Sequence, residues 1–227
     1  MADLEQMMRT TFACRSFSDE PLPDHELAAI LDVARFAPSG GNRQGWQVIV
    51  VRNAERKSTL IDLSVPAIEL YVAQRAAGEN PWNTVDPSTV DPATVSVSPA
   101  ATAWYRDLAQ APVFLVVALD LRVVASADRN LNRIGVISGA SVYPFAQNIL
   151  LAARDRGWAG ALTTFIAAAE PDVQALLHLP SHIAVAALIP LGRPQKVLTK
   201  LTRKPVSEFT HLETFDGPKL DASNPHP

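Results

Sequence analysis

Four short segments of this 227-residue chain carry residue types that could bind a polar or anionic ligand. The first is Pro38–Asn42, in which two glycines allow close backbone approach and Ser39 and Asn42 supply small hydrogen-bonding groups. The second is Arg15, followed by Phe17, in a stretch that leads into prolines. The alternatives are an ordinary tight turn for the first segment and a solvated charge for the second.

The two other segments lie in the second half of the chain. Gly160–Thr164 is a short apolar run with two threonines, whose backbone N–H groups could face a ligand or simply end a strand. After Gly192 the chain becomes basic, with Arg193, Lys196, Lys200, Arg203 and Lys204. Arginine suits phosphate because its planar guanidinium donates two parallel hydrogen bonds. The alternative is a solvated basic tail.

Several sites with clear sequence signatures are absent. The chain contains no G-x-G-x-x-G after a strand, no phosphate-binding G-x-x-x-x-G-K-[ST] loop and no G-x-S-x-G nucleophile elbow. His178 and His182 have a spacing that could chelate a metal on a helix, but Pro180 between them disrupts that geometry. We expect no metal site. Cys14 has no partner cysteine and is interpreted as a small buried apolar residue.

The elements that must position these segments alternate between helices and strands. Apolar spacing predicts helices over residues 24–37, 54–77 (interrupted near Pro66), 138–156 and 170–177, and strands over 46–51, 112–120, 159–164 and 183–191. Asp24 is expected to cap the first helix, and the valine-rich run 46–51 is expected to be buried on both faces. The pattern indicates an α+β or small three-layer protein in one domain over residues 1–227.

Residues 78–105 are expected to form a proline-rich insertion or lid. The stretch 78–98 holds three prolines and little apolar periodicity, and long irregular segments are often binding loops. Trp82, Trp104 and Tyr105 could stack on a flat ligand, or they could pack in the core or at an interface. Residues 192–227 are expected to form a C-terminal arm.

Composition limits the class of protein. Net charge is −3, so nucleic acid is an unfavourable partner. A single cysteine, no apolar run of membrane-spanning length and no signal-peptide pattern at the N-terminus together predict a soluble cytoplasmic protein without a membrane partner. Only 19% of residues are charged, which suits either a buried subunit interface or an alanine-rich helical protein.

Taken in order, the motifs resemble the nitroreductase family, specifically its bacterial FMN oxidoreductases. The resemblance covers roughly residues 5 to 210, and A-P-S-G-G-N-R-Q is its most specific block. The matching motifs are R-S-F-x-x-x-P-L (15–22), A-P-S-G-G-N-R-Q (37–44), Q-N-I-L-L-A-A-R-D-R-G (147–157), L-T-T (162–164), P-L-G-R-P (190–194) and R-K-P (203–205).

This resemblance implies an α+β fold, with a mixed sheet flanked by helices, in an intertwined homodimer that holds FMN at its interface. NAD(P)H would be the co-substrate, and a small molecule such as a nitroaromatic or quinone would be the electron acceptor. The flavin would carry the hydride, so no catalytic side chain is expected. The implied cofactor-binding residues are Arg15, Pro38, Ser39, Gly40, Asn42, Gly160, Leu162, Thr163, Arg193 and Arg203.

The roles implied for these residues differ. Arg15 would meet the ribityl-phosphate or pyrimidine end of FMN, the 38–42 turn would come from the partner subunit, and Arg203, with Arg193, would bind the phosphate. Leu162 and Thr163 would place a backbone N–H beside flavin N5. Trp82, Trp104 and Tyr105 are the expected acceptor-binding residues.

One departure from the family pattern concerns the phosphate. The family often has a basic or polar cluster just before the Arg15 position, where this chain has Thr11-Phe12-Ala13. More of the phosphate would then fall to Arg15, Arg203 or backbone groups. The alternatives left open are a flavin-binding or storage protein without turnover, a flavin-fragmenting or dehalogenating relative, and an interaction module that has lost FMN.

Overall fold

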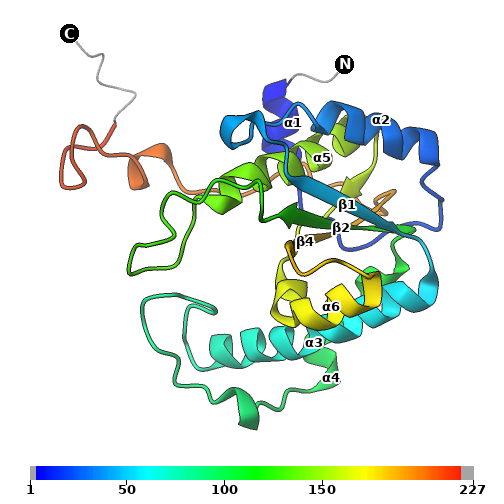
Figure 1. Ribbon diagram of the computed structural model, residues 1–227, viewed down its shortest axis with the longest axis horizontal. Coiled ribbons are helices and arrows are strands. Elements are labelled where there is room, and N and C mark those ends of the chain that lie inside the picture. Colours follow the sequence, from blue (N-terminus) through cyan, green and yellow to red (C-terminus); the bar gives the residue numbers. More distant parts are fainter. Residues whose placement is uncertain (1–3, 221–227) are drawn as a thin grey trace.

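The computed structural model describes residues 4–220, and a four-stranded sheet lies at its centre (Figure 1). The strands are β1 (Trp46–Val51), β2 (Val113–Asp120), β3 (Ala159–Gly160) and β4 (Ile183–Gly192), and their order across the sheet is β1-β2-β4-β3. All three neighbouring pairs are antiparallel, and a register shift falls between Val117 and Ala118.

Two layers of helices cover this sheet. Figure 1 shows α2 and α5 above it and α3, α4 and α6 below it. The helices are α1 (Leu4–Thr10), α2 (Asp24–Ala34), α3 (Ala54–Ala76), α4 (Pro99–Arg106), α5 (Tyr143–Asp155) and α6 (Glu170–Leu177).

The central strand β2 explains why two layers form. All eight of its residues are buried, and their side chains alternate between two cores because successive residues of a strand point to opposite faces. Val113, Leu115 and Val117 pack with α2 and α5, whereas Phe114 and Val116 pack with α3 and its neighbours. A strand without a polar face needs a cover on both sides.

The α+β class with flanking helices is confirmed. The mixed sheet is corrected in one respect, because every pairing among the described strands is antiparallel. The sequence could not fix strand direction, since helices or long loops rather than hairpin turns connect the strands. The expectation that residues 46–51 are buried on both faces was wrong. β1 is an edge strand, and its Gln47 and Val50 are exposed.

Details of the helices also differ from expectation. Pro23 occupies the N-cap position of α2, and no side chain caps that helix. Asp24 instead accepts a hydrogen bond from Arg52 at 2.7 Å. α3 continues through Pro66 without a break, α4 takes up the end of the expected 78–105 insertion, and α1 was not predicted.

The C-terminal segment reaches away from the body of the molecule. Residues 205–220, orange to red in Figure 1, extend outward, and the hydrogen bonds found at the far end are internal, such as that from the Leu212 amide to the Pro218 carbonyl. Phe209 and Phe215 are exposed there. Single exposed apolar residues are ordinary, but two aromatic rings on one projecting arm favour contact with another surface.

Candidate functional site

Arg15 is held beside the third strand by the extended segment between α1 and α2. The Cys14 amide donates to the Gly160 carbonyl at 2.9 Å, and Phe17 forms a bridge with Pro194. Cys14 and Phe17 are buried in the core, whereas Arg15 and Ser16 between them are exposed. Burial raises the pKa of the Cys14 thiol, which fits an inert core residue.

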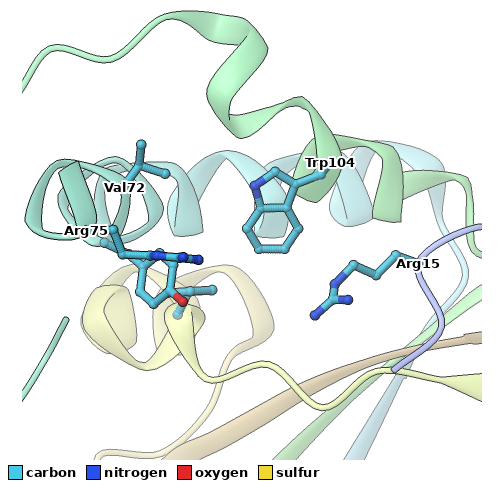
Figure 2. A pocket seen from close by; sticks show the side chains of 6 residues that line it. Arg15, Val72, Arg75 and Trp104 are labelled. Atoms are coloured by element: carbon cyan, nitrogen blue, oxygen red, sulfur yellow. The ribbon is translucent and has the colours of Figure 1, made fainter. Parts of the chain in front are cut away.

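The Arg15 side chain faces two adjoining cavities. The larger, of 580 Å³, is lined by Arg15, Tyr71, Val72, Arg75, Trp104 and Phe165 (Figure 2). The smaller, of 220 Å³, is lined by Arg15, Trp104, Tyr105, Leu108 and residues 161–165. The guanidinium carbon of Arg15 lies 5.4 Å from the centre of the Trp104 ring. No carboxylate of residues 4–220 lines either cavity.

The backbone of residues 162–164 forms the far wall of the smaller cavity. The amide and carbonyl of Thr163 both bond to Leu188 of β4, at 3.0 and 2.8 Å. In an antiparallel pair the residues on either side point their amides away from the partner strand. The amides of Leu162 and Thr164 accordingly have no hydrogen-bond partner among residues 4–220. The donor expected beside flavin N5 is therefore Leu162 or Thr164, and Thr163 is already used.

Two buried hydroxyl groups lie near this edge. Thr163 Oγ1 and Tyr105 Oη are both buried without a hydrogen-bond partner in the described part of the chain. Burial raises the pKa of Tyr105, so the phenol stays neutral. Tyr105 is 0% exposed and packs edge-on to Phe165 and Trp104. Tyr105 therefore packs in the core, the alternative given for it, and its acceptor-binding role stays a prediction.

The Pro38–Asn42 turn lies elsewhere in the chain. Ser39 Oγ accepts from the Gln44 amide, the Gly40 amide donates to Ser141 Oγ, and Gly45 accepts from the amide of Asp120 at the end of β2. Asn42 has a positive φ of 53°, which a side chain of this type tolerates. None of Pro38, Ser39, Gly40 and Asn42 lines either Arg15 cavity.

Arg193 is a structural residue rather than a free cation. Its guanidinium donates to both carboxylate oxygens of Glu20 at 2.9 and 2.8 Å and to the Gly157 carbonyl at 3.0 Å. It also lies 4.0 Å from the centre of the Trp158 ring. Gly157, at φ 78°, ends α5 as predicted, and Arg193 fixes that end. Most of its N–H groups are engaged within the chain, so Arg193 is less available to a phosphate than an unpaired arginine would be.

We expect Arg193→Ala to lower the free energy of unfolding by about 1 kcal/mol. The loss combines the ion pair with Glu20 and the contact with the Trp158 ring, and it is small because the ion pair is partly exposed to solvent. FMN affinity should not change, because Glu20 and the Gly157 carbonyl already hold the Arg193 guanidinium, whereas Arg203 has no carboxylate partner among residues 4–220. The matched control is Arg203→Ala, for which we expect weaker FMN binding and unchanged stability. Thermal unfolding and FMN titration of both variants would test this, and loss of FMN affinity in Arg193→Ala alone would contradict it.

Arg203 and Trp82 are not brought to the Arg15 cavities. Arg203 lines a surface groove with α1, beside Leu4 and Met8. Trp82 is 46% exposed in the 78–98 loop, at a positive φ of 58°. Of the three aromatic residues expected to bind an acceptor, only Trp104 is both in the larger cavity and partly exposed.

The 78–98 loop is held by a carboxylate that the sequence analysis did not single out. Glu79 accepts from the amide and hydroxyl of Thr89 and from the hydroxyl of Ser88. These hydrogen bonds, those from Thr89 foremost, lower the pKa of Glu79. The loop is therefore tied back to the end of α3.

Three cavity residues were also missed. Tyr71 and Arg75 are four residues apart on α3, and Phe165 follows the 162–164 edge. The spacing of Tyr71 and Arg75 places them on one helical face, which was visible in the sequence. The sequence did not indicate that this helical face and Arg15 line the same cavity.

No group of three or more His, Cys, Asp or Glu side chains within residues 4–220 is arranged to hold a metal ion. α6 ends at Leu177, and His178 adopts a left-handed conformation, so His178 and His182 do not share a helix. No helix in the same range is long and apolar enough to cross a membrane.

Fold and site together define an α+β protein with a cationic, aromatic cleft suited to a flat ligand that carries negative charge. The comparison with known proteins is more specific. The chain belongs to the nitroreductase family, whose model matches residues 8–193.

Its relatives include proteins with different named activities. The iodotyrosine deiodinase of Nematostella vectensis is 24% identical over 216 residues, which cover 93% of this chain and 75% of that protein. The FMN reductase (NAD(P)H) of Bacillus subtilis strain 168 is 26% identical over 219 residues, which cover 88% and 70%. A crystal structure of oxidised iodotyrosine deiodinase bound to FMN and 3-iodo-L-tyrosine has a TM-score of 0.66 at 20% identity, covering 94% of this chain and all of that one.

Proposed function

We propose that this protein is a cytoplasmic FMN-dependent NAD(P)H oxidoreductase that reduces small aromatic acceptors such as nitroaromatics or quinones. The observation that carries the proposal is that Arg15 and residues 162–164 line the same cavity, to which residues 4–220 contribute no carboxylate. A free guanidinium and two unpaired amides there suit the polar edge of a flavin. Family membership and relatives whose names include FMN support the same cofactor.

The residues of this chain fit FMN at one edge of the ring. Arg15 would bind the pyrimidine end, where a cation favours the anionic reduced flavin. The amide of Leu162 or Thr164 would face the reacting edge, and Trp104 would lie against the ring system. With Arg193 committed to Glu20, the phosphate is left to Arg203 or to backbone groups. Phe12 is buried in the core and does not contribute a polar contact.

A second copy of the chain would complete this site. The Pro38–Asn42 turn carries the most specific family motif, yet it lies outside the cavities that Arg15 lines. We therefore assign the turn to the FMN of the partner subunit in a homodimer with two shared sites. The projecting C-terminal arm suits such an intertwined arrangement.

Bound FMN would supply the redox chemistry, namely hydride uptake from NAD(P)H and reduction of the acceptor. The protein's task is to position both substrates in turn over one face. The cleft beside Trp104 and Phe165 would hold the nicotinamide first and the acceptor after it leaves. No side chain is assigned a nucleophilic or acid–base role, and Arg15 acts by stabilising negative charge.

The test begins with the absorbance spectrum of the purified protein. We expect a yellow protein that is bleached by NADPH or NADH under anaerobic conditions and regains its colour with a nitroaromatic or quinone. Bound flavin without bleaching would instead favour a storage protein. A colourless protein that does not take up FMN would reject the proposal and favour an interaction module.

Reductive dehalogenation is the second candidate, because iodotyrosine deiodinases are among the relatives. It would use the same flavin site with a halogenated phenol as the acceptor. Comparing halide release from such a phenol with NAD(P)H oxidation by a nitroaromatic separates the two activities. Halide release at a rate well above nitroaromatic reduction would favour the dehalogenase.

A further inference from the structure

The larger cavity holds a second arginine that the cofactor does not require. Arg75, on α3, lines the 580 Å³ cavity, and it does not line the smaller cavity beside the 162–164 edge. Figure 2 shows Arg15 and Arg75 extending into the space from opposite sides, with the Trp104 ring between them. The part of the cleft beside Arg75 is therefore separate from the edge assigned to the flavin.

Within residues 4–220, Arg75 has no anionic partner, and none of its side-chain nitrogens makes a hydrogen bond. Glu79, the next acidic residue along the chain, is occupied by Ser88 and Thr89 of the 78–98 loop. By contrast, Arg106 at the end of α4 pairs with Asp62 of α3 at 2.9 Å. Arg75 remains available to a ligand.

The other walls of the cavity are aromatic or apolar. Tyr71, Val72, Trp104 and Phe165 supply them, and the rings of Tyr71 and Phe165 meet edge to face at 5.4 Å. Such walls suit a flat ring, and a guanidinium binds carboxylate or sulfonate groups through two parallel hydrogen bonds. The cavity thus combines a surface for a ring with one charge for an anionic substituent.

We infer that the acceptor of this enzyme is an aromatic anion, whose carboxylate or similar group binds Arg75 while its ring lies against Trp104 and Phe165. This inference rests on the proposed function and adds the substrate class. Arg75 would then determine specificity by contacting the acceptor, and it would make no contact with FMN. The phosphates of NAD(P)H offer the same anionic chemistry, so the experiment must separate the two sources.

The experiment compares 4-nitrobenzoate with the neutral 4-nitrobenzyl alcohol in the FMN-loaded wild-type protein and in Arg75→Gln. We expect the variant to raise KM for 4-nitrobenzoate roughly fivefold to tenfold, the range for a partly exposed charge-assisted bond, and to leave KM for the alcohol unchanged. Benzoate binding to the oxidised holoenzyme, followed by the flavin absorbance, should weaken by a similar factor. Arg75→Lys should recover part of the loss.

The matched control is Arg56→Gln, which removes the same charge from the first turn of the same helix, outside the cavity. It should alter neither KM. Equal shifts for both acceptors in Arg75→Gln, no shift, or a rise confined to KM for NADPH would each overturn the inference. FMN content measured first distinguishes this from failure of the proposed function, because a wild-type chain that takes up no FMN rejects both before any acceptor is added.

Discussion

Gly160→Ala should destabilise the protein by about 2 kcal/mol or more and reduce its FMN content, because a single methyl group has no space there. A Cβ at this position would lie 2.6 Å from the Pro190 carbonyl oxygen and 3.2 Å from side-chain atoms of Ile189 and Leu150. The nearest atom belongs to the backbone of β4, so it cannot turn away as a side chain could. β3 must instead move off β4.

The same shift would disturb both halves of the Arg15 site. The Gly160 carbonyl accepts the hydrogen bond from Cys14 that holds Arg15 in place, and the 162–164 edge follows directly in the chain. Thermal unfolding should show the melting temperature lowered by roughly 4 °C or more for a chain of this length. FMN titration well below that temperature should show weaker binding.

The matched control is Gly78→Asn. Gly78 has a left-handed backbone, at φ 79°, which asparagine tolerates, and a Cβ there meets no atom within 4 Å, in contrast to Gly160. We expect little change in stability or FMN content. A Gly160→Ala variant that melts and binds FMN as the wild type does would show that β3 can yield without cost, and would refute the coupling.

Helices and strands were predictable where the sequence carries a long apolar run or a clear start signal. The run at 113–120 and the Glu170-Pro171 helix start were correct because burial and proline at a first helical turn leave few alternatives. The edge position of β1 was not predictable, since a valine-rich run reads the same in the centre of a sheet. α1 was missed because seven residues carry too little periodicity.

The site was predictable only in part, because several contacts join residues far apart in the chain. Arg15 and the 162–164 segment could be named from their motifs, and the structure brings them together. The ion pair of Arg193 could not be predicted, since its partner Glu20 lies 173 positions away. An exposed arginine such as Arg15 and an ion-paired arginine such as Arg193 cannot be told apart from the sequence around them.

A second large effect is expected for FMN affinity, if each FMN site is built from residues of both subunits. We expect Arg15→Gln and Asn42→Asp each to reduce FMN affinity tenfold or more, roughly the loss of a charge-assisted hydrogen bond or the gain of a like charge near the flavin. Asn42→Asp keeps side-chain size, and aspartate tolerates the positive φ of Asn42. Arg15→Gln shortens an exposed side chain, so it creates no cavity in the core. Neither should change the fold, which circular dichroism would verify.

Co-expression of the two variants with different affinity tags would then decide where the site lies. In a heterodimer with two shared sites, one site combines both lesions and the other combines the intact Arg15 of one chain with the intact 38–42 turn of its partner. Tandem purification should therefore yield a heterodimer that binds about one FMN per dimer, as two-fold symmetry requires. Differently tagged copies of Arg15→Gln alone should contain no site of wild-type affinity. If instead each chain formed its site alone, every site in the heterodimer would carry one lesion, and FMN binding would stay at the level of the parent variants.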